Sequence, residues 1–150
     1  MTVGTQLVVT AELHYRDPGV ALEWLSRAFG SETRMLIVDD VGRFIFADVG
    51  LGNASFAITP EESPRKLSPA ALGGANTQLV RIRGEFDVDA HCAKARAAGA
   101  TIVQEPVEFF FGDRIYVAAD LEGHLWSFAQ RIPGAGGPPP DGWTITFASR

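Results

Sequence analysis

Residues 110–128 read FFGDRIYVAADLEGHLWSF, and this stretch decides the fold. Apolar and polar side chains alternate both before and after a central Asp-x-x-Gly turn that runs from Asp120 to Gly123. Alternation with a period of two on both sides of a turn is typical of a β-hairpin whose two faces differ. We therefore expect two adjacent strands here, and we expect the upstream chain to supply the rest of their sheet.

The first half of the chain predicts one helix among four strands. Residues 6–15 alternate and are rich in Val and Leu, which favours a strand. Asp17 and Pro18 mark the start of a helix, and Gly30 marks its end. Three further short strands are predicted at 32–39, 43–48 and 54–59.

The second half repeats this order of elements. A strand is predicted at 76–83, and Asp87 is placed to cap a helix over 88–98. Three more strands are predicted at 101–108, 114–119 and 125–131. The repeat predicts an α+β fold of two β-α-β-β-β modules. We expect their sheets side by side, with the helices on the outer faces and the inner faces forming a cup.

Pro and Gly residues divide the chain into its expected parts. The predicted boundaries are a single domain at 1–131, with modules at about 6–59 and 76–131, a linker at 60–75 and a tether at 132–150. Residues 143–147 alternate again. We expect them either to add an edge strand or to dock on a partner chain.

Composition and charge exclude several classes of function. The net charge of −5 argues against a nucleic-acid-binding surface. No apolar run approaches the roughly 20 residues that cross a bilayer, and no secretory signal precedes the first strand. The single cysteine, Cys92, excludes an internal disulfide and fits a reducing compartment. We therefore expect a cytoplasmic protein with neither nucleic-acid nor membrane partners.

Three motifs in this order resemble those of the vicinal oxygen chelate superfamily, and most closely its glyoxalase and bleomycin-resistance branch. The motifs are Arg27-Ala28-Phe29-Gly30, Phe111-Gly112-Asp113-Arg114 and Asp120-Leu121-Glu122-Gly123-His124-Leu125-Trp126-Ser127-Phe128. The resemblance covers roughly Leu7 to Arg131. It implies the paired-module fold, but the superfamily includes isomerases, ring-cleaving dioxygenases, thiol transferases and proteins that only sequester drugs, so it does not decide the activity.

The resemblance also implies where a metal would be bound. Metal-dependent members place His or Glu at four cup-facing strand positions, because a divalent ion needs converging nitrogen and oxygen ligands. The corresponding positions in this sequence are Thr10, Ser55 with Ala57 as the alternative, Gln78 with Thr77 or Leu79 as alternatives, and Ser127. Hydroxyls and an amide bind a transition metal poorly. We therefore expect no metal site and no cofactor.

Other polar side chains are candidates for contact with a ligand. Glu12 and His14 share strand parity with Thr10, so they are expected to face the cup. Glu12 could accept a hydrogen bond from a ligand amine or act as a base, or it could be a solvated carboxylate at the rim. His14 could either contact a ligand or have a structural role.

The hairpin adds three more candidates. If the apolar pair Ile115 and Val117 packs on the helix, Arg114 and Tyr116 point into the cup. Arg114 could bind a carboxylate or phosphate there. The alternative for Arg114 is an ion pair with Asp113 or Asp120. Phe110 belongs to a run of three Phe residues that forms either an aromatic wall at the cup mouth or ordinary core.

The remaining histidines and the cysteine are expected to be structural. We expect His124 to make a hydrogen bond in its turn, His91 to be solvated or partly packed on the second helix, and Cys92 to be an inert buried thiol.

The function expected from the sequence is metal-independent binding of a small organic molecule in an apolar cup, of the drug-sequestration or resistance type, by a homodimer. Two alternatives stay open. One is a metal-dependent lyase, isomerase or dioxygenase of the same superfamily, and the other is an interaction module without a ligand. No catalytic residue is predicted.

Overall fold

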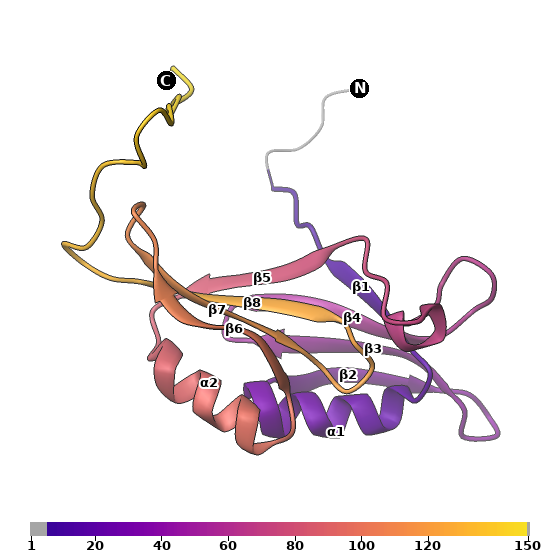
Figure 1. The fold of residues 1–150 in the computed structure, drawn as a ribbon. Coiled ribbons are helices and arrows are strands. Elements are labelled where there is room, and N and C mark those ends of the chain that lie inside the picture. Colours follow the sequence, from indigo (N-terminus) through magenta and orange to yellow (C-terminus); the bar gives the residue numbers. More distant parts are fainter. Residues whose placement is uncertain (1–5, 150) are drawn as a thin grey trace.

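The structure is a computed structural model that describes residues 6–149. Two four-stranded sheets and two α-helices make up the fold (Figure 1). The elements are β1 (Ala11–Tyr15), α1 (Pro18–Phe29), β2 (Glu32–Val38), β3 (Phe44–Leu51), β4 (Ala54–Pro60), a short 3-10 helix (Pro69–Leu72), β5 (Leu79–Gly84), α2 (Val88–Ala97), β6 (Thr101–Glu108), β7 (Asp113–Ala119) and β8 (Leu125–Arg131). The predicted α+β fold of two β-α-β-β-β modules is confirmed. None of the described helices is long and apolar enough to cross a membrane.

The strand order is the same in both modules. The first sheet has the order β1-β4-β3-β2 and the second has the order β5-β8-β7-β6. In each, the first and last strands of the module pair in parallel and the other neighbours are antiparallel. The two sheets remain separate, and both helices lie on the same side of them (Figure 1). The opposite side is called the open face below, and the segment after β8 extends on that side (Figure 1).

Local sequence sets the helix ends as predicted. The Asp17 carboxylate accepts a hydrogen bond from the backbone N–H of Val20 at 3.2 Å, and Pro18 occupies the first turn, where its missing N–H costs nothing. Gly30 ends α1 with φ of +80°, a left-handed conformation that a residue with a Cβ adopts only with strain. In the second module Asp87 caps α2 through the N–H of Ala90.

Aromatic side chains from both modules meet in one core between the helices and the sheets. The Phe29 ring at the end of α1 lies 5.3 Å from the Trp126 ring and 4.8 Å from the Phe128 ring, both on β8. Phe56 of β4 contacts Trp126 edge-on at 4.9 Å. The Trp24 indole N–H donates to the carbonyl of Ala98, at the end of α2. Trp24, Trp126 and Phe128 are buried, as predicted, and the two modules share this core.

The turn between β7 and β8 fastens the second module to the end of β1. The buried carboxylate of Asp120 accepts hydrogen bonds from the Tyr15 hydroxyl and the Trp126 indole. Glu122 accepts from the backbone N–H groups of Arg16 and Asp17. His124, two residues later, donates a hydrogen bond from Nε2 to the carbonyl of His14 at 2.8 Å. This is the structural hydrogen bond predicted for His124.

Several boundaries and environments differ from the prediction. β1 begins at Ala11 and β5 at Leu79, later than the strands expected at 6–15 and 76–83. The three consecutive Phe residues belong neither to a strand nor to the buried core. They form the turn between β6 and β7, with Phe109 and Phe110 half-buried and Phe111 exposed, because the turn projects beyond the helices. The described part of the tail, 132–149, is without helix or strand, so the edge strand expected at 143–147 does not form within the single chain.

Candidate functional site on the open face of the sheets

Strand alternation assigns side chains to the open face. In β1, Leu13 and Tyr15 are buried against the helices, so Glu12 and His14 lie on the opposite side. In β8, Trp126 and Phe128 are buried in the helix-side core, and the residue between them, Ser127, faces the other way.

A small pocket beside β1 gathers part of the predicted site. It has a volume of about 290 Å³, and it is lined by Glu12, His14 and Gln78 together with residues of the linker and His124. The His14 Nδ1 atom shares a hydrogen bond of 2.7 Å with the Thr59 hydroxyl. Burial lowers the pKa of His14, so the imidazole is held in its neutral form near neutral pH. The structure thus places three of the predicted residues together.

The other positions taken over from metal-dependent relatives are spread across the two sheets. Thr10 is exposed and precedes β1, and Ser55 is half-buried on β4, where it pairs with Gly50. Ser127 is nearly buried in the second sheet, in register with Arg81 and Val117. Thr10, Ser55 and Ser127 are not among the residues that line the pocket beside β1.

Strand register also bears on which residue of β5 occupies the position of a metal ligand in metal-dependent relatives. Gln78 lies just before β5, whereas Leu79 is its first residue and pairs with Leu125. Leu79 has the same parity as Arg81, which pairs with Ser127. The register therefore aligns Leu79, one of the two alternatives for Gln78, with the face that carries Ser127.

Arg114 and Tyr116 lie on the helix side of β7, so the condition for their pointing into the cup is not met. The Arg114 guanidinium makes a two-point ion pair with Asp89 of α2, at 2.8 and 2.9 Å, instead of pairing with Asp113 or Asp120. The Tyr116 hydroxyl hydrogen-bonds His91 of α2. Strand alternation puts Tyr116 and the core residue Ala118 on the helix side with Arg114, and it leaves Asp113, Ile115 and Val117 on the open face. Phe110 is in the β6–β7 turn, with its ring 6.1 Å from the ring of Trp143.

Sequence reasoning missed a cluster of arginines on the open face. Arg81 and Arg83 of β5 and Arg131 at the end of β8 surround the carboxylate of Asp113. The signal was present in the sequence, since Arg81 and Arg83 alternate with the apolar Val80 and Ile82 and so must share a face. What the sequence alone did not show is that Asp113, thirty residues later, lies beside them.

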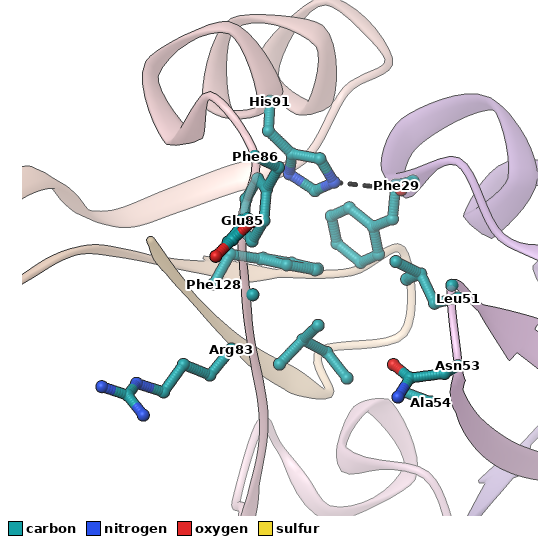
Figure 2. A pocket seen from close by; sticks show the side chains of 12 residues that line it. Phe29, Leu51, Asn53, Ala54, Arg83, Glu85, Phe86, His91 and Phe128 are labelled. Carbon is teal, nitrogen blue, oxygen red and sulfur yellow. Dashed lines mark hydrogen bonds between the residues drawn. The ribbon is translucent and has the colours of Figure 1, made fainter. Parts of the chain in front are cut away.

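A second pocket lies between the two modules on the helix side. It has a volume of about 330 Å³, and Phe29, Phe86, His91 and Phe128 form its aromatic wall (Figure 2). The His91 Nε2–H donates to the Phe29 carbonyl at 3.0 Å, so Nδ1 accepts from Tyr116. Burial lowers the pKa of His91. With both ring nitrogens engaged, His91 presents its ring and not a free polar atom, which makes it partly packed, as expected.

The apolar walls of this pocket point toward one another, while Arg83, which also borders it, extends its guanidinium away (Figure 2). Cys92 follows the pocket residue His91 on α2 and is buried, and burial raises the pKa of its thiol. Its environment is that of the inert thiol expected from the sequence.

Comparison with protein families identifies the fold. The profile of the Glyoxalase/Bleomycin resistance protein/Dioxygenase superfamily matches residues 7–128. The chain belongs to this superfamily. The match extends from the segment before β1 to Phe128 of β8, so it spans both modules.

Solved structures with a similar fold are consistent with this family assignment. TioX from Micromonospora sp. ML1 is 34% identical with a TM-score of 0.68, and the match covers 85% of this chain and 100% of TioX. TnmS3, an antibiotic binding protein from Streptomyces sp. CB03234, is 17% identical with a TM-score of 0.65, covering 87% and 99%. The fosfomycin resistance protein FosX from Listeria monocytogenes, complexed with Mn(II) and sulfate, is 13% identical with a TM-score of 0.62, covering 89% and 94%. At 17% and 13% identity the similarity shows the fold alone.

The metal implied by some superfamily members does not fit the residues present here. Thr10, Ser55, Gln78 and Ser127 supply neutral hydroxyl and amide oxygens, without an imidazole or carboxylate among them. Among residues 6–149 there is no group of three His, Cys, Asp or Glu side chains close enough to hold an ion.

Proposed function

We propose that this chain binds a small organic molecule on the open face of its sheets, without a metal ion. The observation that carries the proposal is the chemistry of the open-face positions, where relatives that use metals place His or Glu. Here Thr10, Ser55 and Ser127 carry hydroxyls, and the fifth-strand position holds either the Gln78 amide or, by register, the apolar Leu79. Such groups hydrogen-bond a neutral polar ligand well, but they do not compete with water for a divalent ion.

Apolar surface around these positions supports the proposal. Met35 and Ile37 of the first sheet and Leu79 and Val107 of the second are large apolar side chains that remain exposed. Exposed apolar side chains such as these can contact the apolar part of a ligand or a second copy of the chain. TnmS3, an antibiotic binding protein of the same fold, supports the same direction.

The proposal includes a cytoplasmic homodimer. β2 is exposed along its whole length, and the tail carries the exposed apolar residues Trp143, Ile145 and Phe147. The tail contacts the β6–β7 turn, where the Gly137 N–H donates a hydrogen bond to the Phe110 carbonyl. A second copy that covers the open face would bury these side chains and enclose a ligand between the two chains.

The test is a binding screen with a matched metal control. Full-length chain purified without chelator is analysed for metal content, and its thermal unfolding is followed with a panel of aromatic natural products and antibiotics, with and without EDTA. A ligand at 100 times its dissociation constant stabilises the fold by about 2.7 kcal/mol. We expect stabilisation that EDTA does not change. Stoichiometric bound metal, or stabilisation by no compound of the panel, would contradict the proposal.

The competing function is a metal-dependent enzyme, and the Mn(II) complex of FosX is the observation that favours it. The same screen separates the two, because an enzyme of that kind loses metal and ligand stabilisation together in EDTA. Size-exclusion chromatography with light scattering tests the homodimer. A monomer at micromolar concentration would contradict that part.

A further inference from the structure

Asp113 is a buried carboxylate contacted by three guanidinium groups. Arg83 binds it at two points, with Nε 2.8 Å from Oδ2 and Nη2 3.1 Å from Oδ1. Arg81 Nη2 lies 3.3 Å from Oδ2, and Arg131 Nη1 lies 3.7 Å from Oδ1. The Asp113 side chain is only 3% exposed, whereas the arginine side chains are about half exposed.

The charges in this cluster do not balance. Within residues 6–149, Asp113 is the one carboxylate within 4.0 Å of Arg81, Arg83 and Arg131. Hydrogen bonding from Arg83 holds the pKa of Asp113 below its ordinary value, and arginine stays protonated, so one negative charge faces three positive charges. The chain as a whole carries a net charge of −5, so this local excess is not a consequence of a basic composition.

The fold explains why the excess collects on the open face. Arg81 and Arg83 are two residues apart on β5, so they project on the same side. Arg81 pairs with Ser127, which pairs with Val117, and these three form one row across the second sheet. The backbone of Arg81 thus lies in register with a hydroxyl and an apolar residue, while its guanidinium reaches along the open face to Asp113.

Hydrogen-bond donors remain available at this place. A guanidinium has five N–H donors. Arg83 uses two of its nitrogens on Asp113, while Arg81 makes one long contact with it and is 46% exposed. One arginine would be enough to neutralise Asp113. Of the two additional guanidinium groups, Arg131 donates to the Phe111 carbonyl, whereas Arg81 keeps further N–H donors and an unneutralised charge.

We propose that Arg81, supported by Arg83, binds an oxyanion of a small organic ligand, such as a carboxylate, phosphate or sulfonate, on the open face. Asp113 is a positioning residue that holds the guanidinium groups in place, and the ligand's apolar part lies on the Val117 side. Paired N–H donors of arginine match the two oxygens of such a group. This inference rests on the proposed function, because it names the chemical class of ligand for the same face.

The test uses two fluorescent probes that differ by one group. Anilinonaphthalene sulfonate carries an oxyanion, and the neutral N-phenylnaphthylamine has the same ring system without it. Both are titrated into full-length protein and into Arg81→Gln. We expect wild type to bind the sulfonate at least about tenfold more tightly than it binds the neutral probe, a difference in binding free energy of about 1.4 kcal/mol. Arg81→Gln is expected to remove this advantage, Arg81→Lys to restore part of it, and neither to change the affinity for the neutral probe. Inorganic phosphate is expected to compete with the sulfonate alone.

Arg114→Gln is the matched control. It removes an arginine from the same sheet that pairs with Asp89 on the helix side, so it should leave both probes unaffected. Thermal unfolding checks that each variant is folded. If the neutral probe binds but the sulfonate gains nothing, or Arg81→Gln weakens both equally, this inference is overturned while the proposed function stands. Binding of neither probe overturns this inference, whereas the proposed function is contradicted only if the ligand panel also fails to stabilise the chain. A change of oligomeric state in Arg81→Gln would assign the cluster to a subunit contact and would also overturn it.

Discussion

The Tyr15 hydroxyl at the end of β1 donates a hydrogen bond to the buried carboxylate of Asp120 at the end of β7. Asp120 also accepts from the Trp126 indole at 3.0 Å and from two backbone N–H groups of its own turn. One carboxylate therefore connects the first strand of one module to the last hairpin of the other. The burial of Tyr15 and the neighbouring Asp120 charge raise the pKa of the Tyr15 hydroxyl, which keeps that group protonated as the donor.

Replacing Tyr15 with Phe should destabilise the whole chain. The change leaves the buried Asp120 carboxylate with one donor fewer, and such a loss costs about 1–3 kcal/mol. Because the two modules share a core, we expect one cooperative unfolding transition with a lower midpoint. Urea denaturation followed by tryptophan fluorescence measures this, with Arg114→Gln as the surface comparison. An unchanged midpoint would show that the contact adds nothing to stability.

Acid should weaken the fold through Asp113. The Arg83 guanidinium holds the pKa of this carboxyl low in the folded chain. A carboxyl with a lowered folded pKa stabilises the fold above its unfolded pKa of about 3.9, and the stabilisation is lost as the pH falls through the folded value. Asp113→Asn should therefore be less stable than wild type at neutral pH and should lose less stability on acidification. Parallel pH profiles of the free energy of unfolding would contradict this.

The tautomer of His91 is a spectroscopic prediction. Because a carbonyl only accepts, the contact with Phe29 requires the proton on Nε2, and Nδ1 then accepts from Tyr116. Nitrogen NMR should show a neutral ring with the proton on Nε2. Burial lowers the pKa of His91, so its stabilising effect is present above the ordinary value of about 6.5 and is lost as the pH falls below it.

Tyr116→Phe extends this test. Removing the hydroxyl leaves the half-buried Nδ1 of His91 without its donor, which should cost about 1–2 kcal/mol. The free energy of unfolding at pH 7 measures the loss. A ring with its proton on Nδ1 in wild type, or full stability of Tyr116→Phe, would refute the assigned hydrogen bonds.

Gly112 should be needed for the path of the tail. Its φ is +89°, and a Cβ there would lie 3.0 Å from the Ala135 carbonyl. Gly42 has a similar φ of +81° but open space around it, so it is a matched control for backbone strain alone. We expect Gly112→Ala to cost more stability than Gly42→Ala and to alter Trp143 fluorescence, since the tail must shift. Equal losses, with no change at Trp143, would show that the tail contact is unimportant.

Much of the fold was predictable because its signals are local. The caps at Asp17 and Asp87 satisfy helix N–H groups within one turn of chain, and Gly30 ends α1 by its own backbone conformation. Period-two alternation placed the strands, although it set the first residues of β1 and β5 too early. β1 and β5 begin only where they gain hydrogen-bonded neighbours, and those neighbours come from β4 and β8, far along the chain.

The site was less predictable because both faces of β7 carry apolar residues. The sequence favours packing Ile115 and Val117 on the helix, which would turn Arg114 and Tyr116 into the cup. In the structure α2 supplies Asp89 and His91 as partners for those polar residues, and this compensates their position under the helix. Such compensation depends on which element covers the sheet.

The sequence by itself determined the order of elements, the repeat of the two modules, and the neutral donors at Thr10, Ser55, Gln78 and Ser127. These depend on residue type and on neighbours within a few positions. Only the tertiary structure decided which side of each strand is open, and only it brought Asp113 to the arginines of β5. Contacts of that kind require β8 to lie between β5 and β7, and hydrogen bonding between distant strands, not local preference, sets that arrangement.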